Sequence, residues 1–106
     1  MRFAPTSELG VAFLFGTISR ELGFIIQWIR AEYPVCGGKR CLDKKRKKFE
    51  PVSIRFEIRS SNFAEHGHSQ EKCNLVVCWL HDWEDCPVNV LELKSKIKHL
   101  PNRRFL

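Results

Sequence analysis

Apolar and polar residues follow a helical pattern near the start of the chain. Residues 5–8 have the features of a helix start, because a hydroxyl side chain can cap the first turn and an acid follows it. The apolar residues that recur at helical spacing are Leu9, Phe13, Ile18 and Leu22. Further apolar residues surround this stripe. We therefore predict a helix over residues 7–22 that is packed on more than one side and is stopped by Gly23.

Four later segments predict β-strands. Residues 24–30 are rich in β-branched and aromatic side chains, and an extension of the helix is the alternative there. Residues 51–60 alternate between apolar and polar side chains, which predicts a half-buried strand. The continuous apolar run 75–79 is typical of a central strand. Residues 88–94 predict a further strand, and residues 94–100 a short closing helix.

The segments between these elements are less regular. Residues 33–50 contain two adjacent glycines and the basic run 44–48, which favours a surface loop or the tip of a hairpin. Residues 61–72 form a polar connection. We find no internal repeat and no domain boundary. The pattern therefore predicts a single α/β domain over residues 1–106, a small mixed β-sheet with the N-terminal helix packed on it.

Composition narrows the class of protein and its expected partners. An apolar fraction of 43% and a charged fraction of 28% are ordinary for a globular domain, which excludes disordered and fibrous classes. The formal net charge of +6 favours nucleic acid as a partner, with DNA preferred, although many proteins carry basic surfaces only for solubility. Five cysteines without a preceding secretory signal indicate a reducing, cytoplasmic compartment. The longest uncharged stretch, residues 9–19, falls short of the roughly 20 apolar residues of a membrane span, so no membrane partner is expected.

An acid and a lysine stand two residues apart in the last predicted strand. On a strand, side chains two apart share a face, so Glu92 and Lys94 are expected to project together. A carboxylate can hold a hard divalent cation while a lysine orients or activates an attacking water, a combination suited to phosphodiester hydrolysis. A surface ion pair at a strand end is the other interpretation, and these two residues alone leave both open.

Several longer motifs carry a family resemblance. They are PTSELGVAFLFG, RELGF, YPVCGGKR, SIRFEIRSSNF, EHGH, CNLVVCWLHDWEDCP and VLELKS. In this order they resemble the pattern of an uncharacterised group of small prokaryotic proteins. Over residues 6–97, the succession of a helix, strands and Glu-Leu-Lys resembles the PD-(D/E)xK nuclease superfamily, which includes restriction endonucleases and archaeal Holliday-junction resolvases.

The resemblance implies a restriction-endonuclease-like core and a metal-dependent site. Glu8 would be the acid of the helix, position 74 and Glu92 would bind Mg²⁺ or Mn²⁺, and Lys94 would be the catalytic lysine. The usual core has a further helix and strand after this lysine, but only twelve residues follow it here. The last strand would then be lacking, or a partner subunit would complete the core. Because open sheet edges favour pairing, a homodimer is expected.

This chain departs from the resembled pattern at three acidic positions. Asn74 stands at the position of the metal-binding aspartate and offers only a neutral carbonyl oxygen, and Val35 and Arg55 also replace acids. Fewer negative charges weaken the binding of a hard cation. Two functions therefore stay open: a metal-dependent endonuclease with a weakened site, or a non-catalytic nucleic-acid-binding or protein-interaction module on the same frame.

Other residue groups suggest binding sites. The expected nucleic-acid contacts are Lys39, Arg40, Lys44, Lys45, Arg46, Lys47, Lys48, Arg55 and His68, with further phosphate contacts from Arg59, Arg103 and Arg104. A solvated basic turn is the alternative for the lysine run. The tryptophans could stack on bases, but core packing is favoured for most aromatics, and only Trp83 lies in a plainly polar stretch.

A zinc site is a rival interpretation of the cysteines and histidines. Its candidate ligands are His66, His68, Cys73, Cys78, His81 and Cys86. Their spacing matches no familiar zinc-finger pattern, and Cys78 lies inside an apolar run where a buried thiol is common. Zinc is therefore the less favoured cofactor.

Overall fold

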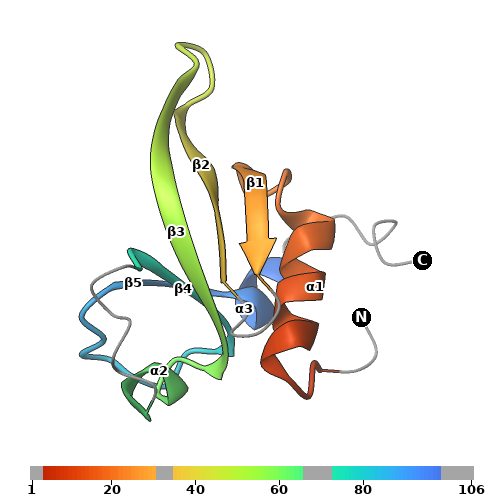
Figure 1. The fold of residues 1–106 in the computed structure, drawn as a ribbon, viewed down its shortest axis with the longest axis vertical. Coiled ribbons are helices and arrows are strands. Elements are labelled where there is room, and N and C mark those ends of the chain that lie inside the picture. Colours follow the sequence, from red (N-terminus) through yellow and green to blue (C-terminus); the bar gives the residue numbers. More distant parts are fainter. Residues whose placement is uncertain (1–3, 31–34, 66–72, 99–106) are drawn as a thin grey trace.

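The computed structural model, which describes residues 4–30, 35–65 and 73–98, contains a five-stranded sheet with helix α1 (Glu8–Ile18) across one face (Figure 1). The strands, in their order across the sheet, are β1 (Phe24–Arg30), β2 (Val35–Asp43), β3 (Lys48–Arg59), β4 (Leu75–Leu80) and β5 (Asn89–Glu92). Strands β1, β2 and β3 are antiparallel, whereas β4 and β5 run parallel to β3. Two short helices are α2 (Asn62–Glu65) and α3 (Leu93–Ile97). The predicted α/β class, mixed sheet and N-terminal helix are confirmed.

Helix α1 begins where the sequence predicts and ends one turn earlier. The Ser7 side chain accepts a hydrogen bond from the backbone N–H of Gly10 at 3.1 Å, so it caps the first turn. After Ile18 the chain forms a turn that ends at Gly23, whose φ of 89° favours glycine. The hydroxyl of Ser19 donates to the Gly16 carbonyl at 3.3 Å. Such side-chain bonds compete with continued helix at this end.

Only one face of α1 is buried, which corrects the expectation of packing on several sides. Val11 and Phe15 have no exposed surface, whereas Phe13 is 77% exposed and Leu9 is also exposed. The ring of Phe15 packs edge-on against Phe24, with ring centroids 5.2 Å apart. Because the helix is apolar around most of its girth, its sequence does not determine which side meets the sheet.

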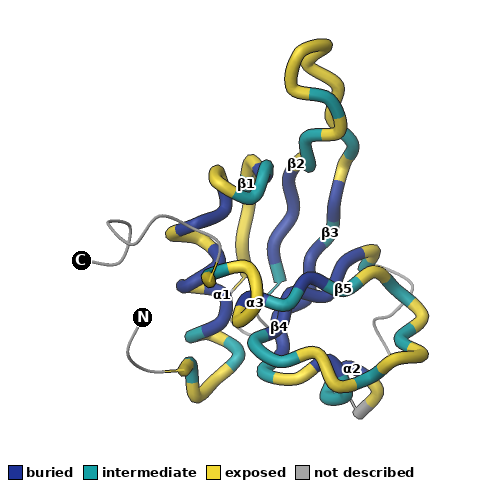
Figure 2. The backbone as a smooth tube through the Cα atoms, turned by 180° about the vertical axis from the view of Figure 1, so that it is seen from behind, coloured by how far each residue is buried: buried dark blue, intermediate teal, exposed yellow. Residues whose placement is uncertain are grey.

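Apolar residues lie on both faces of the sheet at β3 and β4. The main cluster fills the space between α1 and one face, and Figure 2 shows buried backbone concentrated in α1, β3 and β4. On the opposite face a smaller cluster of Phe63, Val76 and Cys78 packs against Trp83 and neighbouring residues.

Burial raises the pKa of the Cys78 thiol to about 12, as expected for an inert structural cysteine.

Strands β2 and β3 extend as a hairpin beyond the rest of the sheet (Figure 1). Residues 33–50 were expected to form a surface loop or the tip of a hairpin. The described part, residues 35–50, pairs as a hairpin with its turn at residues 44–47, and the paired strands are longer than expected. At the turn, the Asp43 carboxylate accepts hydrogen bonds from the N–H groups of Lys45 and Arg46 at 3.0 and 3.2 Å. Gly38 permits close approach of β1, because a Cβ there would overlap the Ile25 carbonyl.

The later elements require two corrections. Strand β5 ends at Glu92, and Lys94 belongs to helix α3 rather than to the predicted strand 88–94. Strand β3 alternates as predicted, but its polar face is also covered, so the strand is not half-buried. Across the described ranges, none of the helices has the length and apolar character needed to cross a lipid bilayer.

Candidate functional site

Asn74, the predicted metal ligand, uses its side chain to extend the pairing of β4 with β3. Its Oδ1 accepts a hydrogen bond from the Ser53 N–H at 2.8 Å, and its Nδ2 donates to the Pro51 carbonyl at 3.4 Å. Its own backbone N–H donates to the Ser53 carbonyl at 3.0 Å. The side-chain amide of Asn74 thus adds hydrogen bonds to β3 next to those of the paired backbones. An aspartate could not donate to Pro51, so asparagine suits this structural role.

Glu92 lies at the opposite end of the parallel strands from Asn74. Cys78 of β4 pairs with Glu92, and Asn74 is four residues before Cys78. At about 3.3 Å per residue, the two predicted ligands are separated by roughly 13 Å along the strands. The expectation that they surround one hollow is therefore wrong. Asn74 and Glu92 are far apart because β5 runs parallel to β4. An antiparallel hairpin would have brought the start of β4 and the end of β5 together.

The remaining residues of the predicted site do not complete it. Lys94 is exposed on α3. Glu8 belongs to α1, which packs on the face of the sheet opposite to Asn74 and Glu92. In the part of the chain that the structure describes, no three His, Cys, Asp or Glu side chains group closely enough to hold a metal ion. The predicted ligands therefore do not come together as one cation site among the described residues.

The candidate zinc ligands are only partly described. His66 and His68 lie outside the described residues. Cys73, Cys78 and Cys86 carry free thiols and lie in or against the smaller apolar cluster.

A polar cluster that the sequence analysis missed joins the carboxyl ends of β3 and β4. The Ser60 hydroxyl, fully buried, accepts hydrogen bonds from the N–H groups of Asp82 and Trp83 at 2.9 and 3.0 Å, and its oxygen lies 2.7 Å from His81 Nδ1. The Asp82 carboxylate accepts from the Ser61 N–H and hydroxyl at 2.9 and 3.0 Å. In the sequence, these polar residues directly follow strands β3 and β4. When two such strands are parallel, the residues after them meet at one edge of the sheet.

The Ser60, His81 and Asp82 side chains resemble the members of a hydrolytic triad, but their environment indicates a structural role. A nucleophilic hydroxyl must be reachable by a substrate. Ser60 has no exposed surface, and its oxygen already receives two backbone hydrogen bonds. The cluster therefore ties the segment after β4 to the end of β3.

Two carboxylates at this edge are stabilised in the charged form. The His81 N–H, which donates to Glu92 Oε2 at 2.8 Å, lowers the pKa of Glu92 below its ordinary value. The Ser61 N–H lowers the pKa of Asp82 in the same way. Both groups are therefore ionised near neutral pH.

Arg55 and Glu57 form an ion pair on the covered face of β3. Arg55 is 8% exposed and Glu57 fully buried, with Arg55 Nε 3.8 Å from Glu57 Oε2. Arg55 was predicted to contact nucleic acid, but it is not accessible to a phosphate group because its charge is directed to Glu57. Its cross-strand partner in β2 is Val35.

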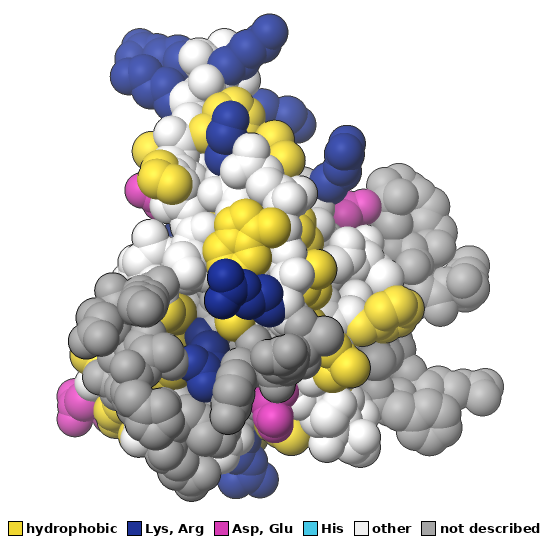
Figure 3. Space-filling view, viewed as in Figure 1, with side chains coloured by type: hydrophobic (Ala, Val, Ile, Leu, Met, Phe, Trp, Pro, Cys, Tyr) yellow, Lys and Arg dark blue, Asp and Glu magenta, His cyan; other side chains and the backbone are white. Residues whose placement is uncertain are grey.

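Among the other predicted nucleic-acid contacts, those at residues 39–48 lie together on the β2–β3 hairpin, whereas Arg59 lies at the opposite end of β3, 4.0 Å from Asp82. Arg103 and Arg104 lie outside the described residues. Residues 39–48 carry seven lysines and arginines and a single acid. The five basic residues at the tip are exposed, and Figure 3 shows Lys and Arg side chains gathered there. Asp43 lies 3.7 Å from Arg46 in an exposed pair and offsets little of this charge.

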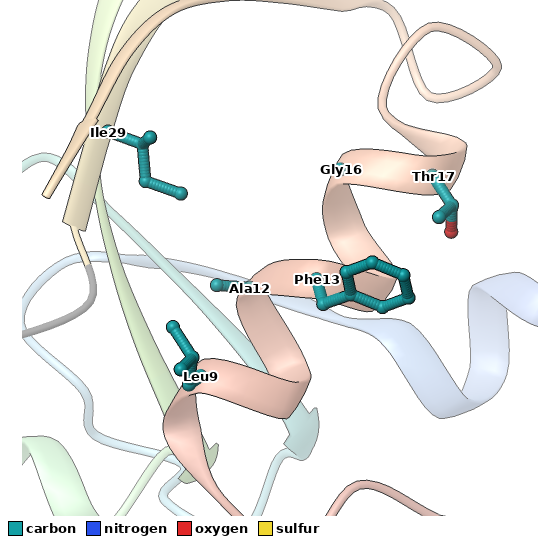
Figure 4. Close-up of a pocket in the computed structure, with 6 residues that line it drawn as sticks. All are labelled: Leu9, Ala12, Phe13, Gly16, Thr17 and Ile29. Carbon is teal, nitrogen blue, oxygen red and sulfur yellow. The ribbon is translucent and has the colours of Figure 1, made fainter. Parts of the chain in front are cut away.

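An apolar groove lies between α1 and the edge strand β1 (Figure 4), with a volume near 350 Å³. Its lining residues are Leu9, Ala12, Phe13, Gly16, Thr17 and Ile29. Phe13 and Ile29 are both well exposed, so this surface is apolar and open to solvent. It contains no acid or base and offers no catalytic group.

Comparison of the chain with family models, curated proteins and solved structures found no match.

The lowered pKa values predict a pH dependence of stability. Stabilisation by Glu92 and Asp82 is fully present above their ordinary values of 4.5 and 3.8 and is lost as the pH falls through the lowered values. In chemical unfolding, the Asp82→Asn/Glu92→Gln variant should therefore lose less unfolding free energy than wild type between about pH 5 and 3. The Glu84→Gln/Asp85→Asn variant is the matched control, and an equal effect of both double variants would contradict the prediction.

Proposed function

We propose that this protein binds nucleic acid through the β2–β3 hairpin and does not hydrolyse it. The observation that carries the proposal is the concentration of basic side chains at the tip of a projecting two-stranded ribbon. A ribbon of this kind fits the major groove of DNA, and lysine and arginine contacts to phosphates supply most of the affinity that does not depend on sequence.

The order of elements supports a nuclease-like frame, but with a different strand in the place of the acid-bearing strand. The sequence predicts the strand of Glu92 there, whereas the order of elements favours β3. Three antiparallel strands follow α1, and α2 and the parallel strand β4 come after the third of them. In the core that the motifs resemble, a helix and a strand likewise follow the acid-bearing strand. Strand β3 would then take that place, with α2 and β4 in the places of the helix and strand that follow it.

If β3 is the acid-bearing strand, Arg55 gives a reason why the nuclease-like fold would be non-catalytic. Val35 and Arg55, which replace acids of the resembled pattern, are cross-strand partners, and Glu57 lies two residues further along the same face of β3. The Arg55 guanidinium supplies the positive charge beside Glu57. A protein that provides this charge itself has no need of a divalent cation there.

Neutralising the hairpin should weaken binding and its dependence on salt. The Lys44→Gln/Lys45→Gln variant removes two phosphate contacts, so the slope of log K against log salt for duplex DNA should become shallower by about 1.8. Fluorescence anisotropy at several salt concentrations measures this slope. The Lys96→Gln/Lys98→Gln variant has the same net charge and should keep the wild-type slope. Equal slopes for both variants would refute the role of the hairpin.

Restoring the acids should create a cation site. In the Val35→Asp/Arg55→Glu variant three carboxylates adjoin, so Mn²⁺ at ten times its Kd should raise the Tm by roughly 5–10 °C, or should be required for folding. The uncharged Val35→Asn/Arg55→Gln variant should show no such shift. Wild type should neither shift nor cut plasmid or single-stranded DNA in Mg²⁺ or Mn²⁺. Cleavage by wild type that is lost in Glu92→Ala would refute the non-catalytic assignment.

We further propose that a second copy of the chain covers the groove between α1 and β1. Strand β1 is the edge of the described sheet, and exposed Leu9, Phe13 and Ile29 line the groove beside it. An open edge next to apolar side chains favours pairing with an identical edge about a two-fold axis.

Acidic side chains introduced into this groove should prevent the two copies from associating. Sedimentation velocity is expected to show a dimer for wild type and a monomer for Phe13→Glu/Ile29→Glu. Leu42→Glu, which alters an exposed apolar residue on the hairpin, is the control and should stay dimeric. A monomeric wild type at high micromolar concentration would rule out the pairing.

A further inference from the structure

Strand β1 presents a tryptophan on the face of the sheet opposite to α1. Trp28 is 46% exposed, and its cross-strand partner is Gly37. Gly37 in turn pairs with Ser53, which faces away from the main core because its neighbour Ile54 belongs to that core. An indole is large and apolar, and nearly half of this residue is open to solvent, which leaves a surface that a ligand can contact.

The backbone of β2 supports the indole directly. A Cβ at position 37 would occupy the space that the Trp28 ring fills, so only glycine allows the ring to lie against this strand. The ring is therefore seated on a paired, buried part of the sheet and is not a side chain free to move in solvent. Trp79 and Trp83, by contrast, are partly buried against the two apolar clusters.

Basic side chains lie near this indole. The Arg30 guanidinium, on the same strand, lies over the Trp28 ring, 5.8 Å from its centroid. Lys39, two residues from Gly37, is on the same face of β2 and is exposed. Beyond Lys39 the strand continues into the hairpin, whose tip carries the basic residues 44–48. A neutral apolar partner does not match these charges as well as a phosphate backbone does.

We infer that Trp28 stacks against unpaired bases, so that the preferred ligand of the protein is single-stranded nucleic acid. The inference rests on the proposed function, because the hairpin lysines would bring the phosphate backbone to this face. In a duplex the faces of the bases are covered by their neighbours, and a ring seated on a sheet cannot reach them. In a single strand an aromatic platform beside basic groups binds bases of any sequence.

The test compares a labelled oligothymidine of about 20 nucleotides with a duplex of equal length by fluorescence anisotropy. Wild type should bind the single strand more tightly than the duplex. Trp28→Ala should weaken single-strand binding roughly 5- to 150-fold and change duplex binding less than about twofold. Trp28→Phe, which keeps an aromatic face, should recover most of the affinity. Gln27→Ala changes an exposed neighbour on the same strand and should behave as wild type.

The outcomes separate this inference from the proposed function. If wild type binds neither ligand, the hairpin function itself fails. If it binds both, and Trp28→Ala weakens neither or weakens both equally, the stacking inference fails while the hairpin function stands. Thermal unfolding of each variant shows whether it is folded, and a Trp28→Phe protein that folds normally but binds single strands as weakly as Trp28→Ala also overturns the inference.

Discussion

Strand β4 pairs in parallel with β3 on one side and with β5 on the other, and these pairings determine which residues can act together. Parallel strands bring their carboxyl ends to one edge, so Ser60, His81 and Glu92 gather there although long segments separate them in sequence. The same geometry moves Asn74 to the far edge. A change in the direction of β5 alone would reverse this arrangement. The chemistry available to the molecule therefore follows from strand direction more than from the presence of particular side chains.

Local signals in the sequence predicted several elements correctly. Ser7 marks the start of α1 because its hydroxyl satisfies a backbone N–H within the same turn, and residues 24–30 carry the β-branched and aromatic side chains that fit a pleated surface. The alternation in β3 likewise reports a strand. In each case the deciding interaction lies within a few residues along the chain.

The features that the sequence did not predict depend on distant partners. Strand β2 contains Gly37 and Gly38, which are poor strand formers, and it is a strand because β1 and β3 flank it. Only eight residues, 81–88, join β4 to β5, a length that normally indicates an antiparallel hairpin, since parallel connections usually take a dozen or more. The site predicted around Asn74 and Glu92 relied on that hairpin. The basic residues of the hairpin tip needed no such assumption, because they are neighbours in sequence.

Charged residues play two opposite roles in the β2–β3 hairpin. Deep in the sheet, Arg55 and Glu57 are held together where water is excluded, and removing either charge alone would break a buried ion pair. At the tip, the positive charges of Lys44 and its neighbours repel one another in solvent, and Asp43 offsets only part of this repulsion. That repulsion opposes closure of the turn, and a polyanion bound along the hairpin would relieve it. Under the proposed function, a bound nucleic acid would therefore stabilise the hairpin tip by neutralising charges that otherwise repel one another.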